Sequence, residues 1–313
     1  MLAGVKPLAI TLGDPAGIGP EVVLKALADL DVPVRLFGNR KLTERSGAIP
    51  PIERFVDCGS AELDFHFGQG SAGSGAISLQ SIDAAVSAIE AGDCSALVTA
   101  PISKTAIAAA GATHPGHTEL LAARAGLARY AFDYAMYFDS PSIRTVLLSV
   151  HVPLREAIAS INADAIAALA RLTIRDYARL HGKPPRIAVA GVNPHAGEGG
   201  LFGDEEAIIT RGVDAARRDG ASIEGPLPPD TVFLSARNGK YDVVMAMYHD
   251  QGLIPVKTLD FERSVNVTLG LPYLRASVDH GTAFDIAGKG IADARPMRYA
   301  IEWTARHAER WRA

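Results

Sequence analysis

The sequence has little cysteine and no long hydrophobic run. Cys58 and Cys94 are its only cysteines, and two cysteines do not make the disulfide framework that would require an oxidising compartment. No apolar stretch reaches the ~20 residues that a membrane-spanning helix needs. The first residues, MLAGVKPLAITLGDPAG, also lack the charged start and long apolar core of a signal peptide. We therefore expect a cytoplasmic protein without a membrane partner.

Long runs of lysine and arginine are absent as well. The formal net charge is -4, with 31 Lys and Arg against 35 Asp and Glu. Proteins that bind nucleic acid through its phosphates need clustered positive charge, so we expect no nucleic-acid partner. A small anionic substrate is compatible with this balance, because it needs only a local positive pocket.

The chain does contain a regular alternation of short apolar runs and amphipathic segments. Asn162 is placed to cap a helix that Gly182 would end, and Pro20 and Glu21 are suited to open another. The apolar runs predict strands at Leu8–Leu12, Val34–Phe37, Ala96–Thr99, Thr145–Val150, Ile187–Ala190, Val243–Met247 and Val265–Leu269.

Strands that alternate with helices predict an α/β fold with mainly parallel sheets and helices on both faces. A chain of 313 residues is long enough for two domains. We expect a discontinuous first domain, residues 1–130 plus 265–313, and a second α/β domain at residues 131–264. The glycine-rich segment Gly68–Gly75 is typical of a flexible surface loop.

Three of the nine histidines share one setting, at or just beyond the carboxyl end of a predicted strand. They are His151 after TVLLSV, His195 after RIAVAGVNP and His249 after DVVMAMY. Ligands bind at that edge of open α/β sheets, where three imidazoles would hold a divalent metal and leave positions open for substrate. Three unrelated, hydrogen-bonded histidines are the alternative, because intermediate burial is normal for histidine, and without an HExxH pattern the spacing is a weak signal. Asp250 either orients His249 or forms a turn.

The segment TLGDPAGIGPE places Gly13, Gly17 and Gly19 between a predicted strand and a predicted helix. Backbone N–H groups at such a helix start attract anions. The spacing GxxxGxG is neither the dinucleotide fingerprint nor a P-loop, and a tight turn without a ligand explains it nearly as well.

Several further polar residues are candidates for ligand binding near the same sheet edge. A cation there would neutralise a phosphate or a carboxylate, although any one charged residue is more commonly a solvated surface group. Thr118 is also explained as a helix cap. The candidates are Lys104, His117, Thr118, Lys257, Asn266 and Arg275.

Six segments in order carry a resemblance to a known family: GDPAGIGPE, GHTELL, NPHAGEGG, YHDQGL, VNVTLGLP and SVDHGTAFDIAGKG. Over essentially its whole length the chain resembles the 4-hydroxythreonine-4-phosphate dehydrogenase family of pyridoxal phosphate biosynthesis. The resemblance implies NAD- or NADP-dependent oxidation of 4-phosphooxy-threonine (4-hydroxy-L-threonine 4-phosphate), followed by decarboxylation to 3-amino-2-oxopropyl phosphate. It also implies the two-domain fold of isocitrate and isopropylmalate dehydrogenases rather than a Rossmann domain.

The resemblance also implies roles for individual residues in a homodimer whose active site lies at the subunit interface, formed by the second domain. The metal ligands, shared between subunits, would be His151, His195 and His249. The substrate ligands would be His117, Thr118, Lys257, Asn266 and Arg275. The segment HGTAFDIAGKG resembles a nicotinamide loop, which would place His280, Gly281, Thr282 and Asp285 beside the cofactor. Imidazole ligands suit Zn or Co, whereas substrate oxygens would suit Mg or Mn.

Two questions stay open at the level of sequence. Lys104, Asp250 and Lys257 are candidates for the general base, and a water molecule at the metal is another. The substrate is the second question, because paralogues act on D-threonate or D-erythronate 4-phosphate or on dihydrodiol carboxylates. A non-catalytic metal- or phosphate-binding protein is an alternative of another class, against which the retained His, Lys and Arg residues weigh.

Overall fold

The computed structural model describes residues 6–47, 54–59 and 66–312. The chain divides into two compact units: unit 1 holds the described residues up to Arg124 together with Pro272–Arg312, and unit 2 is Ala125–Leu271. The edges expected at 130/131 and 264/265 therefore lie elsewhere in the structure. The second edge differs because Val265–Leu269 pairs antiparallel with Ala135–Asp139 and so belongs to unit 2.

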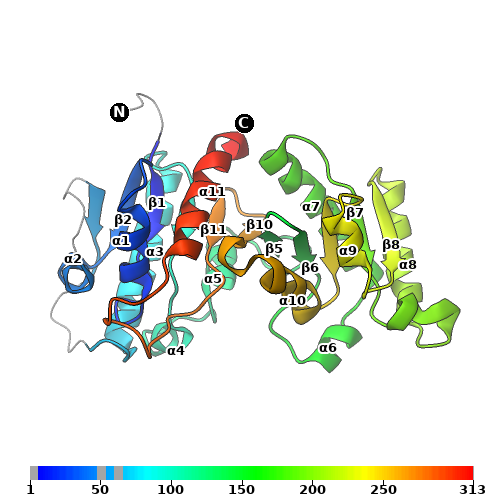
Figure 1. The fold of residues 1–313 in the computed structure, drawn as a ribbon, viewed down its shortest axis with the longest axis horizontal. Helices are drawn as coiled ribbons and strands as arrows, with labels where there is room; N and C mark the ends of the chain where they lie inside the picture. The colour runs from blue at the N-terminus through cyan, green and yellow to red at the C-terminus, as the bar shows by residue number, and fades with distance from the viewer. Residues whose placement is uncertain (1–5, 48–53, 60–65, 313) are drawn as a thin grey trace. The chain divides into compact units, whose positions relative to one another are not determined.

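Unit 1 is built on a parallel sheet with the strand order β3-β2-β1-β4-β11. Strands β1, β2 and β11 are labelled in Figure 1. The central strands are buried along their whole length, as expected for a parallel sheet that is covered on both faces. The strands are β1 (Leu8–Thr11), β2 (Val34–Gly38), β3 (Phe55–Asp57), β4 (Leu97–Thr99) and β11 (Arg275–Ser277).

The helices of unit 1 pack on this sheet, α3 against β1 and β2, and α11 against β4 and β11. They are α1 (Gly19–Leu27), α2 (Arg40–Thr43), the short η1 (Glu44–Ser46), α3 (Ala72–Glu90), α4 (Lys104–Ala109), α5 (His117–Arg124) and α11 (Arg295–Arg312). No helix in the described ranges is both long and apolar enough to cross a membrane.

The segment Gly68–Gly75 is only partly a loop, and the expectation of a loop throughout was wrong. Helix α3 begins at Ala72, where the side chains of Ser71 and Ser74 each accept a hydrogen bond from the other's backbone N–H. Gly75 lies inside this helix, where any Cβ would collide with the carbonyl oxygen of Ala106 in α4. Glycine at this position thus serves close packing of two helices.

Unit 2 contains a mixed sheet with the strand order β10-β5-β6-β9-β7-β8. Strands β10, β5 and β6 pair antiparallel, whereas β6, β9, β7 and β8 pair parallel. The α/β class with mostly parallel sheets is thereby confirmed. The strands are β5 (Ala135–Asp139), β6 (Arg144–Leu147), β7 (Ile187–Ala190), β8 (Ile223–Leu227), β9 (Val243–Ala246) and β10 (Val265–Leu269).

The helices of unit 2 include the one predicted between Asn162 and Gly182. Asn162 Oδ1 accepts a hydrogen bond of 2.8 Å from the backbone N–H of Ala165, and Gly182 ends the helix at φ 77°, so both predicted ends are confirmed. The helices are α6 (Leu154–Ala159), α7 (Ala163–His181), η3 (Pro194–Gly200), α8 (Glu205–Arg218), α9 (Val232–Arg237), α10 (His249–Asp260) and η4 (Phe261–Arg263).

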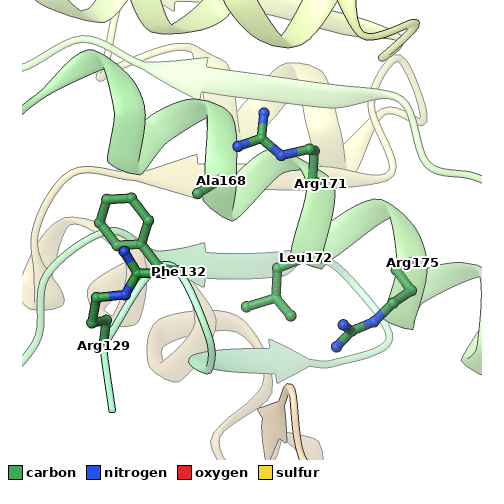
Figure 2. Close-up of a pocket in the computed structure, with 6 residues that line it drawn as sticks. All are labelled: Arg129, Phe132, Ala168, Arg171, Leu172 and Arg175. Carbon is green, nitrogen blue, oxygen red and sulfur yellow. The ribbon is translucent and has the colours of Figure 1, made fainter. Parts of the chain in front are cut away.

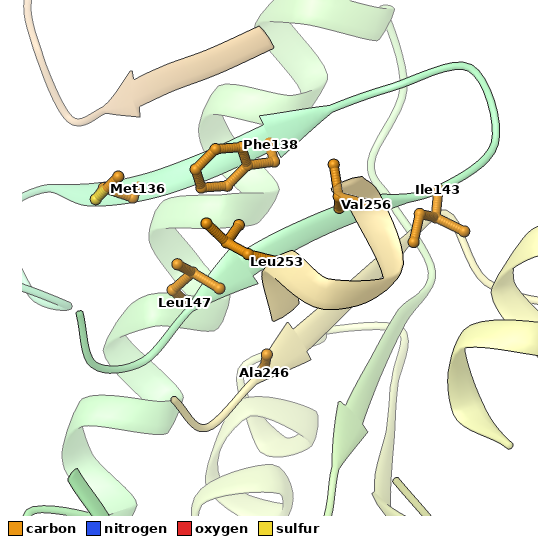
Figure 3. Packing of buried hydrophobic residues seen from close by; sticks show 7 residues of the cluster. All are labelled: Met136, Phe138, Ile143, Leu147, Ala246, Leu253 and Val256. Atoms are coloured by element: carbon orange, nitrogen blue, oxygen red, sulfur yellow. The ribbon is translucent and has the colours of Figure 1, made fainter. Parts of the chain in front are cut away.

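A hydrophobic cluster anchors α10 on strands β5, β6 and β9 (Figure 3). Leu253 and Val256 of α10 are buried in it, together with Met136, Phe138, Ile143, Leu147 and Ala246. Because His249 is the first residue of α10, this packing also limits where the His249 side chain lies.

Candidate functional site

The three histidines singled out from the sequence follow three neighbouring parallel strands of unit 2. His151 lies beyond β6, His249 beyond β9 and His195 beyond β7, and β9 is the central strand of the three. The carboxyl ends of parallel neighbours lie at one edge of a sheet, so all three loops start from the same edge. This part of the prediction is confirmed.

The structure brings the rings of His151 and His249 together. Their centroids are 5.4 Å apart, with an angle of 44° between the ring planes. Nδ1 of His249 lies 2.7 Å from Oδ1 of Asp250, which leaves Nε2 as the nitrogen available to a ligand. Of the two interpretations of Asp250, the contact supports the one in which its carboxylate orients the imidazole.

His195 lies on a loop whose backbone conformation is uncommon. The φ angles of His195, Ala196 and Glu198 are 54°, 54° and 42°, in the left-handed region, which costs roughly 1–2 kcal/mol for each residue other than glycine. Glycines at 197 and 199 share this conformation. Such a run persists only where surrounding contacts hold it.

The carboxylate of Glu206 holds the start of this loop, just before the left-handed residues. Its Oε1 accepts hydrogen bonds from the backbone N–H groups of Val192 and Asn193, at 2.9 and 2.8 Å, and its Oε2 accepts one from Nδ2 of Asn193 at 2.9 Å. Burial alone would raise the pKa of Glu206, but these hydrogen bonds outweigh burial and lower it. Glu206 is therefore an ionised clamp on the loop that carries His195.

Within residues 6–47, 54–59 and 66–312, no group of three or more His, Cys, Asp or Glu side chains is assembled to hold a metal ion. The structure thus joins two of the predicted ligands, His151 and His249, and leaves His195 on its own loop from the same edge. The chemistry of the donors, imidazole nitrogens with one carboxylate behind them, fits a divalent transition metal. The assignment of the three ligands stays a prediction.

In unit 1, the guanidinium of Arg275 is buried and lies close enough to the half-buried His117 to influence its charge state. Arg275 begins β11, is 1% exposed and donates from Nη2 to Oγ1 of Thr99 at 2.7 Å. Burial lowers the pKa of Arg275 to about 10, against opposing effects of Tyr273 and Glu119, so the guanidinium stays charged at neutral pH. Burial, and then the charge of Arg275, hold the pKa of His117 well below its usual value, so its imidazole is neutral.

The other predicted substrate residues and the candidate base Lys104 lie on helices α4, α5 and α10 and on strand β10. In unit 1, Thr118 is buried in α5 and Lys104 is an exposed first residue of α4. In unit 2, Lys257 of α10 has its Nζ 6.0 Å from the ring of Phe261. Two buried side-chain atoms have no hydrogen-bond partner among the described residues, namely Oδ1 of Asn266 in β10 and Nε2 of His117.

The glycine loop after β1 is a tight turn in which the N–H groups of three successive residues already have acceptors. The N–H groups of Ala16 and Gly17 donate to the side chain and the carbonyl of Asp14, at 2.9 and 3.0 Å, and that of Ile18 donates to the carbonyl of Thr282 at 3.0 Å. An anion would have to displace these bonds, so the structure favours the interpretation without an anion. Burial raises the pKa of Asp14, while hydrogen bonds from Ala16 and Ser74 oppose the rise.

The segment resembling a nicotinamide loop packs directly on this glycine turn. A Cβ on Gly17 would lie 3.0 Å from the Cβ of Thr282, so the two segments are as close as a glycine allows. Nδ1 of His280 is 3.1 Å from the carbonyl oxygen of Gly281. Open space surrounds Gly281, and Asp285 is exposed. Contact of these residues with a cofactor stays a prediction.

A separate hollow of about 280 Å³ lies on unit 2, lined by Arg129, Phe132, Ala168, Arg171, Leu172 and Arg175 (Figure 2). Each arginine has an aspartate partner, with N–O distances of 3.3 Å for Asp133, 2.7 Å for Asp219 and 2.8 Å for Asp176. Its positive charge is thus largely balanced, and we assign it no ligand.

Comparison with known proteins decides the family. Residues 13–304 match the family model described as pyridoxal phosphate biosynthetic protein PdxA. The chain belongs to the PdxA family. The 4-hydroxythreonine-4-phosphate dehydrogenase of Beijerinckia indica subsp. indica is 44% identical, over 96% of this chain and 94% of that protein. The D-threonate 4-phosphate dehydrogenase of Salmonella typhimurium is 40% identical, over 95% and 97%.

Solved structures of PdxA relatives agree with the fold. The 4-hydroxythreonine-4-phosphate dehydrogenase of Klebsiella pneumoniae superposes with a TM-score of 0.86 and 38% identity, over 97% of this chain and 99% of that chain. A terephthalate 1,2-cis-dihydrodiol dehydrogenase of Burkholderia xenovorans has a TM-score of 0.66 and 34% identity, over 94% and 95%. As a PdxA family member, the protein is a dehydrogenase and hence an oxidoreductase.

Sequence reasoning missed the residues that support the histidine loops of this PdxA chain. Glu206 and Gln251 are buried polar side chains, and each hydrogen-bonds to main-chain atoms near a histidine. The available signal was position alone, since Gln251 lies inside YHDQGL and Glu206 lies shortly after NPHAGEGG.

Proposed function

We propose that the protein oxidises and decarboxylates 4-phosphooxy-threonine with NAD or NADP, assisted by a divalent metal, as a step of pyridoxal 5'-phosphate biosynthesis. Relatives that carry the corresponding name align over nearly the whole chain. The observation that carries the proposal is the buried guanidinium of Arg275 beside a neutral His117.

That pair suits a phosphorylated acid. Arg275 retains its charge although it is 1% exposed, and a guanidinium fork matches the oxygens of phosphate or carboxylate. A neutral His117 offers a hydrogen bond without adding a second buried charge. We assign Thr118, Lys257 and Asn266 to the remaining polar atoms of the substrate.

We further propose that His151, His195 and His249 hold the metal, which is Zn, Co, Mg or Mn. When bound, it would supply Lewis acidity towards the substrate's oxygens, and the nicotinamide would supply hydride chemistry. Asp250 fixes the His249 imidazole through the 2.7 Å contact to Nδ1. Lys104, Asp250 or Lys257 takes the hydroxyl proton.

The nicotinamide site is assigned to one loop of unit 1. His280, Gly281, Thr282 and Asp285 lie on it, and the contact of Thr282 with the glycine turn at Gly17 holds the loop in place. The open space at Gly281 lets a flat ring approach the backbone closely.

We propose a homodimer that forms through unit 2. Among the described residues, the exposed large hydrophobic side chains all belong to unit 2 except Ile291. They are Val152, Leu154, Leu201, Phe202, Leu234, Ile254, Leu259 and Phe261. Several flank the predicted metal ligands along the chain, which suits an active site at the subunit interface. If they form one contiguous surface, such a surface is typical of a protein–protein contact.

A dehydrogenase for D-threonate 4-phosphate is the second candidate. A relative of that name is 40% identical, and its substrate has the same phosphate and carboxylate for Arg275 to bind. The two substrates differ at the second carbon, which carries an amino group in one and a hydroxyl in the other. A panel of both compounds and D-erythronate 4-phosphate, with NAD and with NADP, separates the candidates by nicotinamide absorbance.

The test of the site is Arg275→Lys. This substitution removes the bidentate guanidinium fork but keeps the positive charge. A lost hydrogen bond to a charged group costs about 1.5–3 kcal/mol. We therefore expect the KM for the phosphorylated substrate to rise about 10- to 100-fold. The affinity for NAD or NADP should change little. Arg298→Lys, at an arginine paired with Asp29 on the surface, is the control. An unchanged KM removes Arg275 from the substrate site, and absence of nicotinamide reduction across the panel overturns the proposed reaction.

A further inference from the structure

We infer that Gln251 is a positioning residue, which sets the spacing of the loops that carry the three histidines. The inference rests on the proposed function, in which those histidines hold a metal. Gln251 lies in α10, two residues after His249, and is 8% exposed.

The carboxamide of Gln251 joins two of the three loops directly. Its Oε1 accepts a hydrogen bond of 2.7 Å from the backbone N–H of Met247, just before His249. Its Nε2 donates one of 2.7 Å to the carbonyl of Gly191, in the segment that leads to His195. The oxygen and the nitrogen of one carboxamide are thus hydrogen-bonded to main-chain atoms of different loops.

The third loop is joined through the same main-chain residue. Oγ of Ser149 donates a hydrogen bond of 2.9 Å to the carbonyl of Met247, and Ser149 lies two residues before His151. The bonds therefore run from the β6 loop through Met247 and Gln251 to Gly191 beyond β7. Every loop that carries a predicted ligand is included.

These bonds lie just beyond the last paired residues of β6, β9 and β7. The register of β6 on β9 ends at Leu147 with Ala246, and that of β7 on β9 ends at Val189 with Met245. Two residues beyond the last pair of β7 and β9, the Gln251 side chain connects Met247 and Gly191 by hydrogen bonds. Metal ligands must be held within about 0.5 Å of a productive geometry, so a bond of this kind influences metal affinity as well as folding.

Removal of the carboxamide leaves the N–H of Met247 and the carbonyl of Gly191 without this buried partner. Loss of a residue that supports metal ligands typically costs 10- to 100-fold in metal affinity. Gln251→Met keeps much of the volume and removes both hydrogen bonds. Gln251→Glu keeps an acceptor for Met247 but places an oxygen against the carbonyl of Gly191, so it breaks the link to the His195 loop and should also weaken Co²⁺ binding.

The experiment titrates Co²⁺ into the full-length, metal-stripped protein by calorimetry and measures the Tm of the metal-free form. Thr173→Val is the matched control, since Thr173 is fully buried in α7 of the same unit and donates to the carbonyl of Leu169 at 2.7 Å. It should lower Tm without changing Co²⁺ affinity. Gln251→Met should weaken Co²⁺ binding about 10- to 100-fold, and His195→Ala should abolish it.

The outcomes separate this inference from the proposed function. If folded Gln251→Met binds Co²⁺ as tightly as the wild type while His195→Ala does not bind it, the positioning role alone is overturned. Should Gln251→Met fail to fold, wild-type affinity in Gln251→Glu overturns it equally. No Co²⁺ binding by the wild type overturns the metal site and this inference together.

Discussion

Replacing Glu206 with glutamine is expected to destabilise unit 2 by removing one acceptor oxygen from a buried clamp. Both carboxylate oxygens of Glu206 accept hydrogen bonds, Oε1 from the N–H groups of Val192 and Asn193 and Oε2 from Nδ2 of Asn193. A glutamine has one acceptor oxygen and one NH₂ group. In either orientation of the amide, its NH₂ group faces an N–H donor of the loop.

The size of the effect follows from these contacts. A hydrogen bond to a charged group contributes about 1.5–3 kcal/mol, and a buried donor left without an acceptor costs about 1–3 kcal/mol. Because the three bonds share one carboxylate, their contributions do not add. We expect Glu206→Gln to lower the free energy of unfolding by about 2–4 kcal/mol at pH 7.

The same structure fixes the pH dependence of the loss. The pKa of Glu206 is lowered in the folded protein from its ordinary value of 4.5. Its contribution is therefore fully present above pH 4.5 and disappears as the pH falls through the lower folded-state pKa. Urea unfolding at pH 7 and at pH 4 should show a smaller difference between wild type and Glu206→Gln at the lower pH.

Glu205→Gln is the control, because Glu205 accepts only one hydrogen bond from the same Asn193 side chain, at 2.7 Å, and is half-buried. It should cost well under half as much. Equal losses in the two variants, or a difference for Glu206→Gln that is the same at both pH values, would refute the idea that an ionised Glu206 holds the loop.

Two predictions concern the scaffold. Asn162→Ala removes the side-chain acceptor at the start of α7 and should lower the free energy of unfolding by about 1 kcal/mol; Asn162→Ser, measured in the same urea titration, should restore most of it. Leu253→Ala opens a cavity beneath α10 in the cluster of Figure 3 and should lower the free energy of unfolding by about 2–5 kcal/mol. Leu253→Met should lower it by less than about 1.5 kcal/mol. Equal losses in the two variants would contradict the packing described for this cluster.

Much of the fold was predictable because its strongest signals are local. The helix α7 carries its own cap at Asn162 and its own stop at Gly182, so neither end depends on distant residues. The central strands are apolar on both faces because both faces are covered, which makes them stand out from the surrounding segments.

The parts that were missed depend on distant contacts. Strand β5 was not predicted, and its antiparallel partner β10 moved the edge between the units from residue 264 to Leu271. Gly75 resembles a loop residue in the sequence, but in the structure the carbonyl of Ala106 occupies the space that a side chain would need. In each case a partner far along the chain decides the local structure.

The candidate site shows the same division between local pattern and distant partner. The position of His249 was predictable because an imidazole after an apolar strand marks a sheet edge where ligands bind. Gln251 was not, because its two partners are a main-chain N–H and a main-chain carbonyl, and every residue type except proline offers both groups. A bond to the backbone imposes no residue type on its partner and leaves no spacing pattern. The residues that set ligand geometry are therefore harder to find in a sequence than the ligands themselves, even when they lie two positions away.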